Sequence, residues 1–218
     1  VSVGVHCAYR ASDEARGFDA VDREPSARAA RSHAAVSDET YHTACATCHT
    51  AASFRGDCAR MPEGCPTRAR PEVTRDPRPY LEPARAALMR VADASPYTPE
   101  GERRSRVEEL LFFVKERGLT RVGVAFCVSM TKEAQRLAER LEAEGVTAEL
   151  ACCRLGAIDY DEVGLTKAHP DRFASACNPV AQARLLDDQG VQLIVQMGLC
   201  LGHDLIRQET AKAPVTTL

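Results

Sequence analysis

Short apolar runs alternate with segments of helical periodicity in the second half of the chain, and this alternation restricts the fold more than any other feature. Strand-like runs occupy residues 121–127, 146–152, 192–197 and the segment from 215 onward. Helical spacing marks 82–94, about 99–117, 131–145, 178–189 and the residues that follow Gly202. Strands and helices that alternate in this way form parallel βαβ units. We therefore expect an α/β domain over residues 80–218, with an open, three-layer parallel sheet.

The first part of the chain has a different composition. Residues 1–40 are rich in Ala, Arg, Ser and acidic residues without an apolar period, which predicts a disordered or non-native leader. Residues 41–79 combine four cysteines with several prolines, which favours turns over long helices. We expect this stretch to be a small, irregular Cys-rich segment that binds metal, because it has too few apolar residues for a core. The last residues, from Val215 to Leu218, resemble a strand cut short, so we expect a C-terminal truncation.

Charge and composition exclude several classes of protein. The net charge of −3 and the absence of Trp argue against nucleic-acid binding. No apolar run approaches the roughly 20 residues of a membrane span. The N-terminus lacks a basic segment followed by an apolar one, so no secretion signal is expected. We expect a cytoplasmic protein that does not contact membranes, and the sequence does not indicate its oligomeric state.

The chain contains ten cysteines, which is unusual for a cytoplasmic protein. The cytoplasm keeps thiols reduced, so metal or redox chemistry is favoured over disulfides. One group lies in the Cys-rich segment, and a second follows the predicted strands; Cys7 belongs to neither. The first group is Cys45, Cys48, Cys58 and Cys65, and the second is Cys127, Cys152, Cys153, Cys177 and Cys200.

The second group is predicted to meet at one edge of the sheet. In an open parallel sheet, ligands bind outside the carboxyl ends of the strands. Cys152 should point to the opposite face because side chains alternate along a strand. The alternative is that these residues are buried core cysteines. The predicted thiolate ligands of a metal at this edge are Cys127, Cys153, Cys177 and Cys200.

Other residues near this edge are candidates for catalysis or cofactor binding. Gly198 and Gly202 would let the backbone approach a bound group, and Asn178 is a further cofactor-binding candidate. Asn178 and Pro179 also suit the N-cap and first position of a helix. The predicted catalytic residues are Cys200, His203 and Asp204, with helix capping as the alternative role of Asp204.

The first group has the spacing Cys45-x2-Cys48-x9-Cys58-x6-Cys65 and is followed by Pro66. Its four thiols predict a bound zinc ion or iron–sulfur cluster, and the spacing does not distinguish them. A redox dithiol and disordered thiols are the remaining alternatives. Cys45 to His49 also match the CxxCH signature of c-type haem attachment. The absence of an export signal and the two further cysteines disfavour haem.

Several motifs together resemble an uncharacterised prokaryotic family, the domain-of-unknown-function eighteen-forty-seven family. They are Ala125-Phe126-Cys127, Cys177-Asn178-Pro179 with Gln182-Ala183, Gly198-Leu199-Cys200-x-Gly202-His203-Asp204, and Ala213 to Leu218. The resemblance covers about residues 41–218, and the Cys-rich segment ending in Cys65-Pro66 also matches. Members are often described as metal-binding, so the resemblance implies a metal site. This chain has Ser129 where Gly is common, and it lacks a later strand and a His-containing motif.

These observations favour a cysteine-ligated metalloprotein, carrying an iron–sulfur cluster or zinc, with a redox function and a redox partner protein. One alternative is a binding module stabilised by zinc, without catalysis. Another is a thiol-based transferase or redox enzyme in which Cys200 is the nucleophile. The sequence identifies no substrate or reaction.

Overall fold

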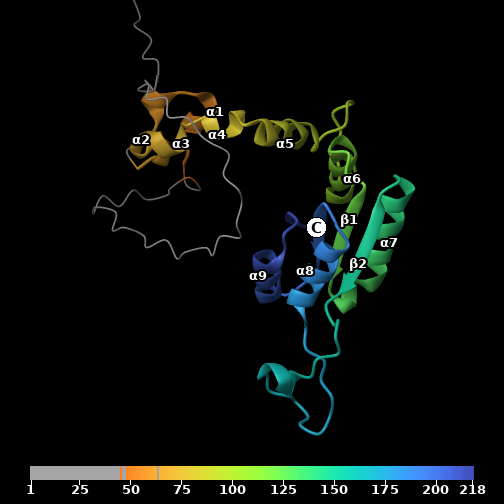
Figure 1. The fold of residues 1–218 in the computed structure, drawn as a ribbon. Helices are drawn as coiled ribbons and strands as arrows, with labels where there is room; N and C mark the ends of the chain where they lie inside the picture. The colour runs from red at the N-terminus through yellow and green to blue at the C-terminus, as the bar shows by residue number, and fades with distance from the viewer. Residues whose placement is uncertain (1–44, 46–47, 63) are drawn as a thin grey trace, which may run out of the picture. The chain divides into compact units, whose positions relative to one another are not determined.

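The computed structural model describes residue 45 and residues 48–62 and 64–218 (Figure 1). The leader predicted over residues 1–40, including Cys7, lies outside the described residues. The described chain forms two compact units that divide between Glu82 and Pro83, and each is described by itself.

The first unit is a series of single helical turns. They are α1 (Ala52–Arg55), the 3₁₀ turn η2 (Cys58–Arg60), α2 (Pro66–Ala69), α3 (Pro71–Thr74) and α4 (Arg78–Leu81). Proline starts α2 and α3, where its missing N–H is not needed. Among the described apolar residues of this unit, only Ala52 and Met61 are buried. The unit therefore has almost no hydrophobic core.

The second unit is built on a four-stranded parallel sheet. The strands are β1 (Arg121–Phe126), β2 (Thr147–Cys152), β3 (Leu193–Met197) and β4 (Val215–Thr217), in the order β2-β1-β3-β4. This confirms the predicted α/β class and the open parallel sheet. β1 and β3 are buried along almost their whole length, as expected for strands covered on both faces.

Helices cover both faces of this sheet. One core lies between the sheet and α6 (Arg106–Glu116) and α7 (Thr131–Ala143), and includes Val122, Val124, Phe126, Leu111 and Leu141. The opposite core lies beneath α8 (Pro179–Asp188), beside which α9 (Leu201–Thr210) packs (Figure 1). Gly123 allows α8 to approach, because a Cβ there would lie 3.1 Å from Leu186. None of the helices in the described part of the chain has the length and apolar character needed to cross a membrane.

The prediction of a helix from about residue 99 was wrong at its start. α5 spans Pro83–Ala94, and α6 begins only at Arg106. Before it, Thr98 pairs with Glu102 in a turn, with its N–H 2.8 Å from the Glu102 carbonyl oxygen. Ser105 and Glu108 then form a capping box, in which each side chain accepts a hydrogen bond from the other's backbone N–H. The Ser-x-x-Glu signature of this box was present in the sequence.

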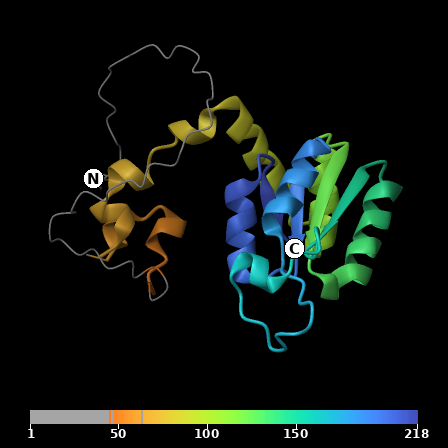
Figure 2. The ribbon, with the colours of Figure 1, turned by 60° about the horizontal axis from the view of Figure 1, so that its bottom comes forward.

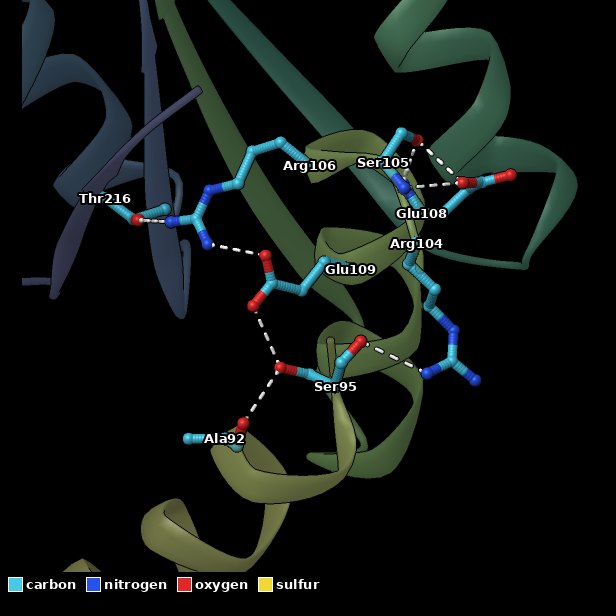
Figure 3. A network of polar contacts seen from close by, with 8 residues as sticks. All are labelled: Ala92, Ser95, Arg104, Ser105, Arg106, Glu108, Glu109 and Thr216. Atoms are coloured by element: carbon cyan, nitrogen blue, oxygen red, sulfur yellow. Dashed lines mark hydrogen bonds and ion pairs between the residues drawn. The ribbon is translucent and has the colours of Figure 1, made fainter. Parts of the chain in front are cut away.

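A polar network joins α5, α6 and β4 (Figure 3). Ser95 donates to Glu109 Oε1 at 2.9 Å and contacts the Ala92 carbonyl oxygen at 3.2 Å. Arg106 pairs with Glu109 Oε2 at 2.8 Å and donates to the Thr216 hydroxyl at 3.1 Å. The Arg106 guanidinium, followed by the Ser95 hydroxyl, lowers the pKa of Glu109. Glu109 therefore connects two helices to the edge of the sheet.

Glu109→Gln is expected to lower the free energy of unfolding at pH 7 by about 1 kcal/mol, because it removes the charge that Arg106 contacts. The pKa of Glu109 is lower in the folded state than in the unfolded state. The contribution of Glu109 to the free energy of unfolding is therefore present above the unfolded pKa and is lost as pH falls through the folded pKa. The difference between the wild type and the variant should therefore shrink below about pH 4. Urea denaturation at pH 7 and pH 3 measures it. Glu116→Gln, an exposed change on the same helix, is the control, and equal effects of the two variants would contradict this role.

Candidate thiol site at the carboxyl edge of the sheet

The strand order places a topological switch point between β1 and β3. From β1 the chain crosses to β2 on one side, and from β2 it crosses to β3 on the other. The loops that leave β1 and β3 therefore diverge, and ligands of open α/β sheets bind outside the carboxyl ends of the strands at such a point. Cys127 directly follows β1, and Gly198 to Cys200 follow β3. The Cys127 N–H donates to the Met197 carbonyl oxygen at 3.0 Å, which holds the two loops together at their origin.

Cys127 and Cys153 lie side by side at this edge. Phe126 is paired with Cys152 in the β1–β2 register, so the next residues of the two strands are neighbours. The Cys153 N–H donates to the Phe126 carbonyl oxygen at 2.9 Å, and the Val128 N–H points at the Cys153 sulfur at 3.4 Å. Cys152 packs against the core beneath α6 and α7 on the other face.

Cys177 joins this pair through the long connection between β2 and α8. This connection, residues 153–178, extends away from the sheet in both views (Figures 1 and 2). The connection returns beside its own start. There the Ala176 N–H donates to the Ile158 carbonyl oxygen at 2.7 Å, and the Asn178 N–H donates to the Cys153 carbonyl oxygen at 2.8 Å. Cys177 is thereby fixed next to Cys153, and the charge of Cys177 is the largest influence that raises the pKa of Arg154.

The electrostatics of the three thiols are linked. Burial, reinforced by the charges of Cys177, Cys127 and Cys152, raises the pKa of Cys153 to about 12. The Ser129 hydroxyl, 3.2 Å from the Cys127 sulfur, is the largest of several influences that lower the pKa of Cys127. The group therefore combines a half-buried thiol that favours the thiolate with a buried thiol that resists ionisation. We call Cys127, Cys153 and Cys177 the edge thiols.

Cys200 is not joined to the edge thiols by any hydrogen bond or charge interaction in the described structure. The helix predicted to open at Gly202 begins one residue earlier, so Cys200 is the exposed N-cap of α9. Asp204 lies within the helix and is not its cap; its carboxylate accepts from Arg207 Nη2 at 3.1 Å. The Nδ1 atom of His203 is buried without a partner among the described atoms.

Two of the three residues predicted to bind a cofactor, Asn178 and Gly198, have structural roles in the described chain. The Asn178 Oδ1 caps α8 by accepting a hydrogen bond from the Ala181 N–H at 3.0 Å. The Asn178 Nδ2 donates to the Leu155 carbonyl oxygen at 3.3 Å. Asn178 and Pro179 thus occupy the predicted N-cap and first helical position. Gly198 has φ +60°, and a Cβ there would lie 2.6 Å from Met130, so glycine is required. Gly202 has open space around it.

Two buried polar residues beneath the site were not assigned a role from the sequence. The Gln182 Nε2 donates to the carbonyl oxygens of Ala151 at 2.8 Å and Phe126 at 3.3 Å, which ties together the ends of β2 and β1. Arg207 is fully buried and donates to Gln196 and Asp204. Burial lowers the pKa of Arg207, and Asp204 opposes this shift. For Gln182 and Arg207 alike, the signal available in the sequence was a polar residue on the buried face of a helix.

The Cys-rich segment places three of its four cysteines around one hollow of about 340 Å³. These are Cys45, Cys48 and Cys65, whereas Cys58 lines a separate hollow and lies 3.7 Å from Arg75 Nη1. The Thr50 hydroxyl and the backbone N–H groups at the start of α1 lower the pKa of Cys48. For Cys65, burial is the largest influence and raises the pKa, but the N–H groups of α2 and nearby hydroxyls lower it overall.

These groups define what the site can hold. Within the described ranges, no three Cys, His, Asp or Glu side chains are close enough to bind a single metal ion as they stand. The cysteine sulfurs of the edge thiols and of the Cys-rich segment are nevertheless soft donors, which suit zinc or iron–sulfur chemistry. The edge thiols also have a cationic neighbour in Arg154, whose pKa burial lowers but the charges of Cys177 and Cys153 raise overall.

Gln182→Leu is expected to destabilise the protein by roughly 1–3 kcal/mol, because two buried carbonyl oxygens each lose a hydrogen bond. Urea denaturation of the metal-free protein measures the change. Gln208→Leu is the matched control, since Gln208 is exposed on α9. If the two substitutions cost the same, Gln182 does not hold the strand ends together.

Comparisons with known proteins place the chain in a family. A family model described as "Protein of unknown function (DUF1847)" matches residues 65–218, so Cys45, Cys48 and Cys58 lie outside the match. An uncharacterised protein of Methanocaldococcus jannaschii is 33% identical over 131 residues, which cover 59% of this chain and 67% of that protein. No solved structure matches the chain. Neither description names a ligand or a reaction. The chain belongs to the DUF1847 family of proteins of unknown function.

Proposed function

We propose that this protein carries an iron–sulfur cluster at the carboxyl edge of its sheet and works in electron transfer or reductive chemistry. The observation that carries the proposal is the convergence of the edge thiols from three separate parts of the chain. Cys127 directly follows β1, Cys153 directly follows β2, and Cys177 precedes the N-cap of α8. Three thiols that meet at the ligand-binding edge of an α/β sheet form a soft donor set.

The spacing of the thiols favours a cluster over a single zinc ion. Zinc binds sulfur at about 2.3 Å, so its ligands must lie within about 4 Å of one another. The described part of the chain contains no such trio in its present arrangement. A cluster of several irons lies between its thiolates and holds them farther apart. It therefore requires less movement of these side chains than one ion would.

The charge balance of the site also supports a cationic centre. Burial of Cys153 beside two other thiols strongly disfavours its thiolate, which is why its pKa is raised to about 12. A bound iron centre would reverse this preference, because metal coordination deprotonates a thiol. Arg154 and the Val128 N–H would then stabilise the remaining negative charge.

The fourth ligand in this proposal is Cys200. It lies on the loop after β3, which borders β1 at the switch point. Its exposure leaves the side chain free to turn toward the edge thiols. His203 and Asp204, in the first turns of α9, lie close to this ligand in the sequence and are proposed to set its surroundings. A cluster held here would exchange electrons with a redox partner protein in the cytoplasm.

The Cys-rich segment is proposed to hold a second, structural metal ion. Cys48 and Cys65 line the same hollow as Cys45, and both have their pKa lowered by N–H groups at helix starts. With only two buried apolar residues described, this unit has little else to stabilise it. In such small units, metal binding supplies the folding free energy. Zinc, which has no redox chemistry, suits this role, and its binding would have to draw together thiols that form no metal-ready trio in the described residues as they stand.

Anaerobic reconstitution of the full chain with iron and sulfide is expected to give a brown protein with broad visible absorption. Cys127→Ser, Cys153→Ser and Cys177→Ser should each reduce the bound iron at least several-fold, because each removes a ligand. Iron and sulfide analysis with visible spectroscopy measures this. The matched control is Cys152→Ser, which changes a neighbouring cysteine whose side chain lies on the opposite face. Equal iron in all four variants, or a colourless wild type, would reject the edge site.

The structural site in the Cys-rich segment is tested separately by zinc content. Cys48→Ser and Cys65→Ser are expected to lose about one equivalent of zinc while retaining the visible absorption of the edge site. Inductively coupled plasma mass spectrometry on the purified full chain measures both metals. Retention of zinc in these variants would show that the segment holds no metal through Cys48 and Cys65.

A further inference from the structure

We propose that Cys127 and Cys153 form a dithiol pair that performs thiol–disulfide exchange when no metal is bound. This activity goes beyond the proposed cluster and does not require it. It rests on the position of the two residues just beyond adjacent strands, on their unequal exposure and on the Ser129 hydroxyl beside the Cys127 sulfur.

The sheet register brings the two residues within disulfide distance. Cys127 and Cys153 follow the paired residues Phe126 and Cys152. The Cys153 N–H continues the strand pairing by donating a hydrogen bond to the Phe126 carbonyl oxygen. Neighbouring strands lie about 4.8 Å apart. Disulfides join residues whose Cα atoms are roughly 4.4–6.8 Å apart. Because the two residues already face each other across paired strand ends, bond formation needs rotation of side chains and little backbone movement.

The two thiols differ in exposure, and this assigns them different roles. Cys127 is half-buried at the surface end of β1, whereas Cys153 is only 1% exposed. An external disulfide can therefore reach Cys127 and cannot reach Cys153. The Ser129 hydroxyl, 3.2 Å from the Cys127 sulfur, is placed to stabilise a thiolate there. Cys127 is the attacking residue, and Cys153 is the resolving residue.

The proposed oxidant is a low-molecular-weight disulfide. The Cys127 thiolate attacks one sulfur of this disulfide, its S–S bond breaks, and one thiolate leaves and takes a proton from solvent. Cys153 then attacks the Cys127 sulfur, the mixed S–S bond breaks, and the proton of Cys153 passes to the departing thiolate, which leaves as the second thiol. The external disulfide gains two electrons and becomes two thiols. Cys127 and Cys153 lose two electrons and become a disulfide.

The neighbouring cysteines compete poorly for this role. Cys152 packs into the core on the opposite face of the sheet, so its sulfur points away from Cys127. Cys177 lies beside Cys153 with the cationic Arg154 as a charged neighbour. Cys200 is exposed at the start of α9 and has no contact with the pair in the described structure. The pair is therefore expected to form in preference to other combinations.

The test uses reduced, chelator-treated full chain exposed to oxidised glutathione, then alkylated, digested with trypsin and mapped by mass spectrometry. Cleavage separates Cys127, Cys177 and Cys200 into different peptides, but Cys152 and Cys153 share the peptide 141–154. Cys152→Ser, or Cys152→Ala if that variant folds poorly, resolves this ambiguity. The expected product links the Cys127 peptide to the Cys153 peptide, with two thiols lost per chain.

Single variants test the order of attack. Cys153→Ser should accumulate a stable glutathione adduct on Cys127, because no resolving thiol remains. Cys127→Ser should leave Cys153 reduced over the same period. A reduced Cys127 in oxidised wild-type protein, or a Cys127 linked mainly to another cysteine, would overturn the proposal. Because this experiment is done without metal, its outcome is independent of whether the protein binds iron.

Discussion

The hydrogen bond from the Cys153 N–H to the Phe126 carbonyl oxygen extends the β1–β2 pairing one residue beyond β2, and the candidate site depends on it. It sets Cys127 and Cys153 side by side on the same face. The Gln182 amide secures the same strand ends from α8, and the Asn178 N–H returns the chain to Cys153. Three connections between backbone segments thus gather thiols from distant parts of the sequence.

The fold followed from the sequence because its signals are local. Apolar runs marked all four strands, and the Asn178-Pro179 pair marked the start of α8. The start of α6 was predicted wrongly, since helical spacing was extended through a turn and the capping box at Ser105 was overlooked. Periodicity identifies the body of a helix, but capping chemistry determines where it begins.

The site was predicted less completely because it depends on tertiary contacts. Strand ends correctly placed Cys127 and Cys153 at one edge, and alternation placed Cys152 on the other face. The exposed N-cap position of Cys200 depends on where α9 starts, which periodicity did not determine. The Gln182 bridge depends on the distance between α8 and the sheet, which no local pattern encodes.

The most direct test of this account is thiol footprinting of the full chain by mass spectrometry, with and without anaerobic iron and sulfide. Each cysteine is alkylated for a fixed time, and the labelled fraction is compared between the two states. Iron and sulfide should protect Cys127, Cys177 and Cys200 and leave the labelling of Cys152 unchanged, whereas the buried Cys153 should label little in either state. Equal labelling of Cys127, Cys177 and Cys200 in both states would contradict the assignment of this edge as the metal site.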